Sequence, residues 1–139
     1  MTVIGFDTAH RTFDLSSAHS FFSAYNIITR NTLGGGTNFE LIFNKTYQSY
    51  DRVIVLSDMQ AWAGGYAGNA LPSYQAYCKR VGATPRVFSF DLAGYGTLAF
   101  PADKIYQLFG FSDKAFDVLT QLEAGDRDAM VHEIEKVVL

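Results

Sequence analysis

The sequence has little charge, only three prolines and a single cysteine, Cys78. A lone cysteine excludes an internal disulfide and is typical of a reducing compartment, so we expect a cytoplasmic protein. No apolar run approaches the ~20 residues that a helix needs to cross a bilayer, and the first residues do not read as a secretory signal, so we expect no membrane association. A net charge of −3 excludes a general electrostatic attraction to nucleic acid.

The chain is instead rich in apolar and aromatic side chains. Of its 139 residues, 48% are hydrophobic and 15% aromatic, against 18% charged. This composition predicts one compact domain over residues 1–139 and argues against disorder. It also suggests that another molecule covers part of the surface, because exposed apolar patches usually mark an interface.

Strand-like and helix-like segments alternate along the chain. The two strand-like runs 52–57 and 86–92 are apolar at consecutive positions, which predicts strands buried on both faces of a parallel sheet. The alternation predicts an α/β domain with helices on both faces of a mainly parallel sheet. We expect strands at 2–6, 52–57, 86–92 and 104–111, and helices at 17–30, 38–49, 72–81, 112–124 and 126–138.

Three of the expected strands end on an aspartate: Asp7, Asp58 and Asp91. Ligands of open α/β sheets bind outside the carboxyl ends of the strands, so these side chains could share one rim and hold a divalent cation or a basic partner. The alternative is that each aspartate only begins a turn or caps the next helix. The residues by themselves leave both readings open.

A glycine-rich stretch at 34–36 precedes Thr37. It is not a phosphate-binding loop, because no Gly-Lys-Ser/Thr follows it, and a nucleotide-binding or hydrolase domain would also lack a nucleophile and a general base. Thr37 and Glu40 have the spacing of a helix capping box. The Thr37 hydroxyl could instead be an oxygen ligand of a hard cation, and one hydroxyl can hardly serve both purposes. No pair of histidines has metal-ligand spacing.

Three runs together resemble the von Willebrand factor A domain of Ro60/TROVE proteins: GGGTNFELIF (34–43), RVIVLSDMQAWAGG (52–65) and RVFSFDLAGYGTLAFPADKIYQLFGFSDKAFDVL (86–119). The resemblance covers nearly the whole chain. It implies a doubly wound, Rossmann-like sheet with a metal-ion-dependent adhesion site at its carboxyl edge. The motif of that site has three parts: Asp-x-Ser-x-Ser after the first strand, a Thr in a glycine-rich loop, and an Asp that ends a later strand.

The resemblance assigns Thr37 to the second part and Asp58 to the third, so these two residues are the implied ligands of Mg²⁺ or another divalent cation. Asp7 and Asp91 match no part and would at most line the rim. The Asp-x-Ser-x-Ser part is missing, because the chain corresponds to a domain that lacks its first strand and helix. We therefore expect cation binding in the complete domain, and weak or no binding by this chain alone.

The missing strand would lie in the middle of the sheet, between 2–6 and 52–57. Three arrangements could make up for it: direct pairing of these two strands, a strand from a second copy, or a strand from a separate chain.

The resemblance implies a non-catalytic, partner-binding module of a Ro60/TROVE-like ribonucleoprotein with a residual adhesion site. The alternative is one half of a split von Willebrand A domain that assembles with a separate chain or with itself and has no metal function of its own. The partner is then a protein or a second copy, and RNA is reached only through a TROVE ring that these residues do not contain.

Overall fold

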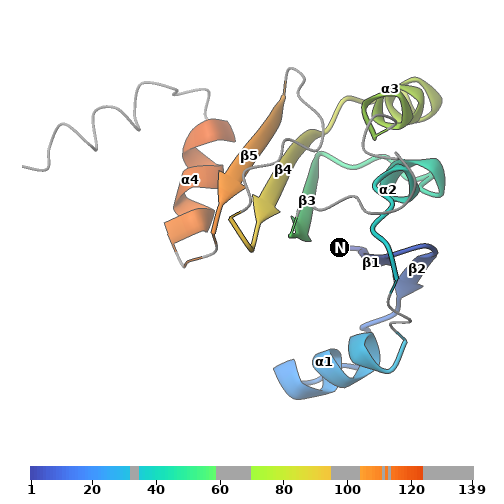
Figure 1. Ribbon diagram of the computed structural model, residues 1–139, viewed down its shortest axis with the longest axis vertical. Coiled ribbons are helices and arrows are strands. Elements are labelled where there is room, and N and C mark those ends of the chain that lie inside the picture. Colours follow the sequence, from blue (N-terminus) through green and yellow to red (C-terminus); the bar gives the residue numbers. More distant parts are fainter. Residues whose placement is uncertain (32–34, 59–69, 95–103, 111, 113, 124–139) are drawn as a thin grey trace, which may run out of the picture.

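The computed structural model describes residues 1–31, 35–58, 70–94, 104–110, 112 and 114–123 (Figure 1). Strands and helices alternate along these residues, which confirms the α/β class. The strands are β1 (Val3–Phe6), β2 (His10–Phe13), β3 (Arg52–Ser57), β4 (Arg86–Asp91) and β5 (Ile105–Phe109), and the helices are α1 (Phe21–Thr29), α2 (Glu40–Asn44), α3 (Ala70–Val81) and α4 (Lys114–Glu123). The helix expected at 126–138 lies outside the described residues.

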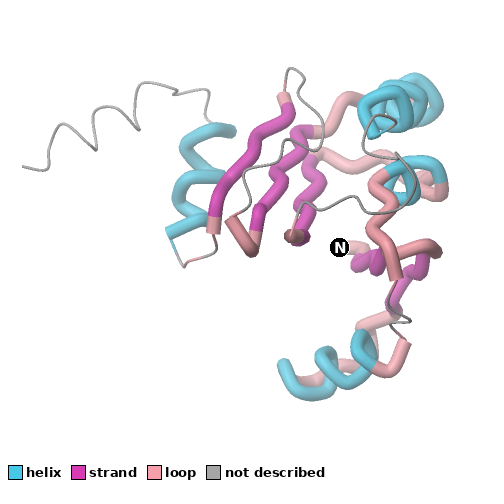
Figure 2. The backbone as a smooth tube through the Cα atoms, viewed as in Figure 1, coloured by secondary structure: helices cyan, strands magenta, loops and turns pink. Residues whose placement is uncertain are grey.

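β3, β4 and β5 form a three-stranded parallel sheet in that order (Figure 2). The register aligns Ile54 of β3 with Phe88 of β4, and Leu56 with Phe90. Parallel neighbours need long crossover connections, and α3 lies in the chain between β3 and β4. The expected parallel sheet is therefore present in this half of the chain.

β1 does not join that sheet. It pairs with β2 in antiparallel register, Val3 opposite Phe13 and Phe6 opposite His10, as a separate two-stranded sheet. The direct pairing of 2–6 with 52–57 considered above is therefore wrong. Sequence reasoning missed β2 because HRTF is short and mostly polar, so it has none of the apolar alternation that indicates a strand.

Each face of the three-stranded sheet has its own apolar cluster. On one face α2 and α3 pack Phe43, Tyr74 and Tyr77 against Val55 and Val87. On the other face α4 covers β4 and β5, with the following residues in contact: Phe88, Phe90 and Leu119 at the centre, and Tyr106, Leu108, Ala115 and Leu122 around them. Helices on both faces of a parallel sheet are the arrangement of Rossmann-like folds.

β3 is covered on only one of its faces, which corrects the expectation of burial on both. Val55 is 3% exposed on the α2 side, whereas Ile54 and Leu56, which point to the α4 side, are 41% and 51% exposed. Successive side chains of a strand point to opposite faces, and α4 reaches only β4 and β5. An apolar strip along β3 is therefore left open.

α1 stands apart from both sheets (Figure 1) and has no buried residue. It begins at Phe21 instead of residue 17, because Ser20 is its N-cap and forms a capping box with Ser23. Phe21, Phe22 and Tyr25 lie together on the helix but are 77%, 75% and 56% exposed. The amphipathic pattern thus predicted the helix correctly, but no described residue covers its apolar face.

α2 is shorter than the helix expected at 38–49, and α3 fixes its end. The Arg80 guanidinium donates Nη2 hydrogen bonds to the carbonyls of Phe43 (2.6 Å) and Thr46 (2.7 Å) and lies over the rings of Tyr47 and Tyr77. The Phe43 carbonyl also accepts the Thr46 amide at 3.2 Å, and Arg80 adds a charged donor to both carbonyls at this end of α2. α3 begins at Ala70, two residues before the expected start, and ends as expected before Gly82, whose φ is +67°.

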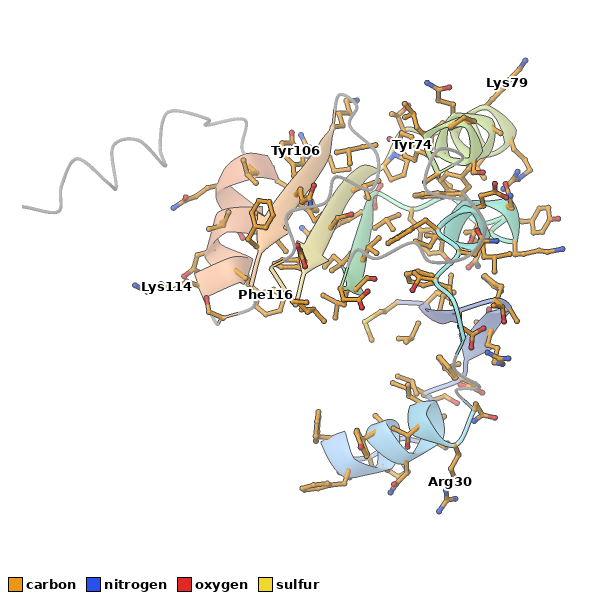
Figure 3. All side chains as sticks on the ribbon, in the orientation of Figure 1. Arg30, Tyr74, Lys79, Tyr106, Lys114 and Phe116 are labelled. Carbon is orange, nitrogen blue, oxygen red and sulfur yellow. The ribbon has the colours of Figure 1, made fainter. Side chains whose placement is uncertain are left out.

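We predict that Arg80→Met lowers the free energy of unfolding by about 1–2 kcal/mol, because two carbonyls lose a charged donor while the apolar stem is kept. The matched control is Lys79→Met, since Lys79 points into solvent from the same turn of α3 (Figure 3). Urea unfolding of both variants measures the difference. Equal stability of the two variants would show that the cap does not contribute.

Candidate functional site at the carboxyl edge

β1 and β3 both contact the apolar cluster formed by α2 and α3. At their amino ends the Tyr50 hydroxyl donates to Thr2 Oγ1 at 2.8 Å. At the carboxyl end of β1, Phe6 packs on Phe39 with ring centroids 5.5 Å apart, just before the first residue of α2. The two candidate ligands lie at different strand ends: Thr37 is next to Asn38, which bonds the carboxyl end of β1, and Asp58 follows the carboxyl end of β3.

The segment 35–38 lies against the carboxyl end of β1 and the turn that follows it. Gly35 has a φ of +128°, and a Cβ there would lie 3.3 Å from Thr8 Cγ2 in the β1–β2 turn, so glycine suits both the backbone and the close approach. The Asn38 amide donates to the Asp7 carbonyl at 3.1 Å, which holds the segment against the end of β1.

Thr37 does not cap α2. The helix begins at Glu40, and the Asn38 side chain accepts the Glu40 amide at 3.0 Å, so the capping box expected between Thr37 and Glu40 is wrong. Asparagine caps as well as threonine does and sits closer to the first turn. Thr37 is half-buried near the carboxyl end of β1, and it remains a candidate ligand.

Asp58 follows directly after β3 and is exposed. Its Oδ1 accepts a long hydrogen bond, 3.5 Å, from the hydroxyl of Ser57. Asp58 thus follows the carboxyl end of β3, whereas Thr37 lies near the carboxyl end of β1, and a cation site shared by the two stays a prediction.

The other two aspartates serve their own turns. Asp7 accepts the Ala9 amide at 2.7 Å and forms an ion pair with Arg11 at 3.1 Å. Asp91 is fully buried and accepts the amides of Ala93 (3.2 Å) and Gly94 (2.8 Å). For both residues the turn reading is confirmed, because each carboxylate accepts backbone amides of the turn that follows it.

The implied cation does not have a complete set of ligands among the described residues. Within these ranges no three His, Cys, Asp or Glu side chains gather into a metal site. Thr37 and Asp58 offer two side-chain oxygens, while Mg²⁺ takes about six oxygen ligands in octahedral geometry. Thr37 and Asp58 alone therefore do not fit the cation.

The opposite, amino edge carries a polar hollow that sequence reasoning missed. It is lined by Ser49, Tyr50, Asp51, Arg52, Arg86 and Glu123. Arg52 forms a two-point ion pair with Glu123, and this hydrogen bonding raises the pKa of Arg52. Nothing in the sequence could indicate the pair, because the two residues are 71 positions apart. The pair ties the end of α4 to the start of β3, and we assign it a structural role.

Nε2 of His10 is buried and has no hydrogen-bond partner among the described residues. Burial lowers the pKa of His10, and the nearby positive charge of Lys45 acts in the same direction. His10 opens β2, away from Thr37 and Asp58 in the chain, so it adds no ligand to their edge.

Comparison with known proteins gives a structural likeness alone. The fold matches part of the crystal structure of the Ro (RSR) protein of Deinococcus radiodurans, with a TM-score of 0.68 and 17% sequence identity. The match covers 90% of this chain, which spans only 26% of that chain. No family model and no curated protein matches the sequence. No helix within the described residues is long and apolar enough to cross a membrane.

We predict that the purified chain binds Mg²⁺ or Mn²⁺ with a dissociation constant no tighter than about 1 mM, because two oxygens are too few for a hard cation. Isothermal calorimetry measures this, with Asp58→Ala as the comparison variant. Micromolar binding that disappears in Asp58→Ala would contradict the prediction and mean that other residues of this chain complete the site.

Proposed function

We propose that this chain is a non-catalytic, partner-binding module of the von Willebrand A type that works within a Ro-like, RNA-binding ribonucleoprotein. The observation that carries the proposal is the division of the strands into two sheets that share one helix layer. An edge strand with exposed apolar side chains, as in β3, is suited to binding another polypeptide and offers little to a small substrate.

The distribution of exposed apolar side chains supports binding over catalysis. Ile54 and Leu56 are exposed along β3, and three aromatic side chains are exposed on α1. Such patches usually mark contacts with other macromolecules. At the carboxyl edge, where α/β enzymes place their catalytic groups, Asp7 and Asp91 are already engaged by backbone amides.

The Ro-like part of the proposal rests on two independent likenesses. The sequence runs around Thr37, Asp58 and β4 resemble the von Willebrand A domain of Ro60/TROVE proteins, and the fold resembles a quarter of the Deinococcus Ro protein. RNA contact in such a particle would come from the remainder of the assembly, since this chain carries a net charge of −3.

We propose that a divalent cation binds only in the assembled state. Thr37 on the β1 side and Asp58 on the β3 side would be its ligands from this chain, and the partner would supply the other oxygens. A bound Mg²⁺ would bridge acidic groups of the two polypeptides.

We predict that the chain, recovered from its native host through a C-terminal tag, sediments with RNA and well above 15.4 kDa. The purified chain alone should retain no RNA in filter binding at physiological salt, because it lacks the positive charge that holds phosphates. A host-recovered chain that sediments alone and without RNA would contradict the proposed function.

A further inference from the structure

His10 lies where the β1–β2 hairpin meets the α2/α3 cluster. It is directly opposite Phe6 in the antiparallel register, and opposite residues of such a pair project on the same face. On that face the Phe6 ring packs on Phe39 of the cluster. Nε2 of His10 is buried and has no hydrogen-bond partner among the described residues. The contact between the hairpin and the cluster therefore contains a buried ring nitrogen that can titrate.

The charge that acts on His10 disfavours its protonated form. Lys45, which directly follows α2, is the charged group that acts on the ring, and it is positive. Glu40, the carboxylate of that helix, is its first residue, at the opposite end. On the hairpin itself Asp7 pairs with Arg11, and Arg11 projects on the face opposite to His10 because successive side chains of a strand alternate.

Protonation gives the imidazole an N–H at both ring nitrogens and a positive charge. With the hairpin in place, that charge would lie at a buried nitrogen without an acceptor among the described residues. Burial is the largest cause of the lowered pKa of His10, and the charge of Lys45 adds to it, while a hydrogen bond to its own backbone opposes both. Opening the hairpin from α2 exposes the ring to water, where the pKa is about 6.5. Below that pH the open form therefore binds the proton better than the folded form does.

The hairpin also holds the segment that contains Thr37. The Asp7 carbonyl accepts the Asn38 amide at 3.1 Å, and Gly35 lies so close to Thr8 that a Cβ would be 3.3 Å from its Cγ2. Thr37 lies in the chain between these two attachments. A change in how tightly the hairpin is held is therefore transmitted to Thr37.

We propose that the β1–β2 hairpin is an acid-sensitive element, in which a proton taken up from solvent by His10 weakens the contact with α2 and loosens the segment that carries Thr37. The neutral ring, beside Phe6, keeps the hairpin in place at neutral pH, and acidification favours the open form. The device would regulate the candidate cation ligand that β1 positions. It goes beyond the proposed function and does not depend on it, since it follows from the hairpin and α2 alone.

Amide exchange of the purified full chain at about pH 7.5 and about pH 5.5 gives the first test, expressed as protection factors so that the intrinsic pH dependence of exchange is removed. One proton changes the opening equilibrium by at most about tenfold for each pH unit below about 6.5. We expect the protection of β1, β2 and the Asn38 amide to fall about three- to tenfold, while that of β3 and β4 stays constant. An equal fall in both sheets, or none in the hairpin, would overturn the inference. A fall in the hairpin that leaves Asn38 unchanged would overturn the link to Thr37.

A pair of variants gives the second test. His10→Phe keeps a ring opposite Phe6 but cannot take up a proton, so the pH dependence of hairpin protection should disappear. His19→Phe is the matched control, at a histidine outside the hairpin, and should retain the full fall. A pH dependence that survives in His10→Phe would overturn the inference.

The imidazole resonances of the wild-type chain give a check that requires no variant to fold. In an NMR titration His10 should take up its proton below about pH 6.5, and uptake at or above that pH would overturn the inference. None of these measurements involves a partner, RNA or a cation, so their failure leaves the proposed function standing.

Discussion

One apolar cluster holds this molecule together, and both sheets depend on it. Phe39, Phe43 and Tyr77, all nearly fully buried, bring together the helices α2 and α3, β3 and, through Phe6, β1. Because the cluster is shared, β1 and β3 contact the same core although they do not pair. The division of the sheet is thus a feature of the core packing.

The two faces of the sheet differ in which strands the helices cover. The α2/α3 side has helices over β3 and β4 and receives β1 as well. On the other side α4 alone covers β4 and β5, fixed at its end by the ion pair between Arg52 and Glu123. Burying a leucine or isoleucine side chain fully contributes ~1.5–3 kcal/mol of free energy. Covering the two half-exposed side chains on β3 would therefore favour binding substantially.

The same division accounts for the state of the cation site. Thr37 is held on the β1 side through the segment that Asn38 fastens to Asp7, whereas Asp58 extends from β3. The two residues are therefore placed by strands of separate sheets.

The sequence by itself determined the local elements of strongest pattern. The run 52–57 forms β3 to the residue, 86–92 forms β4 within one residue, and Gly82 ends α3. The tertiary structure alone decided how those elements are paired and covered. The polar segment β2 is a strand because it pairs with β1. Ile54 is exposed because α4 does not reach it. Strand and helix patterns depend on neighbouring residues, whereas burial and pairing depend on segments far away in the chain.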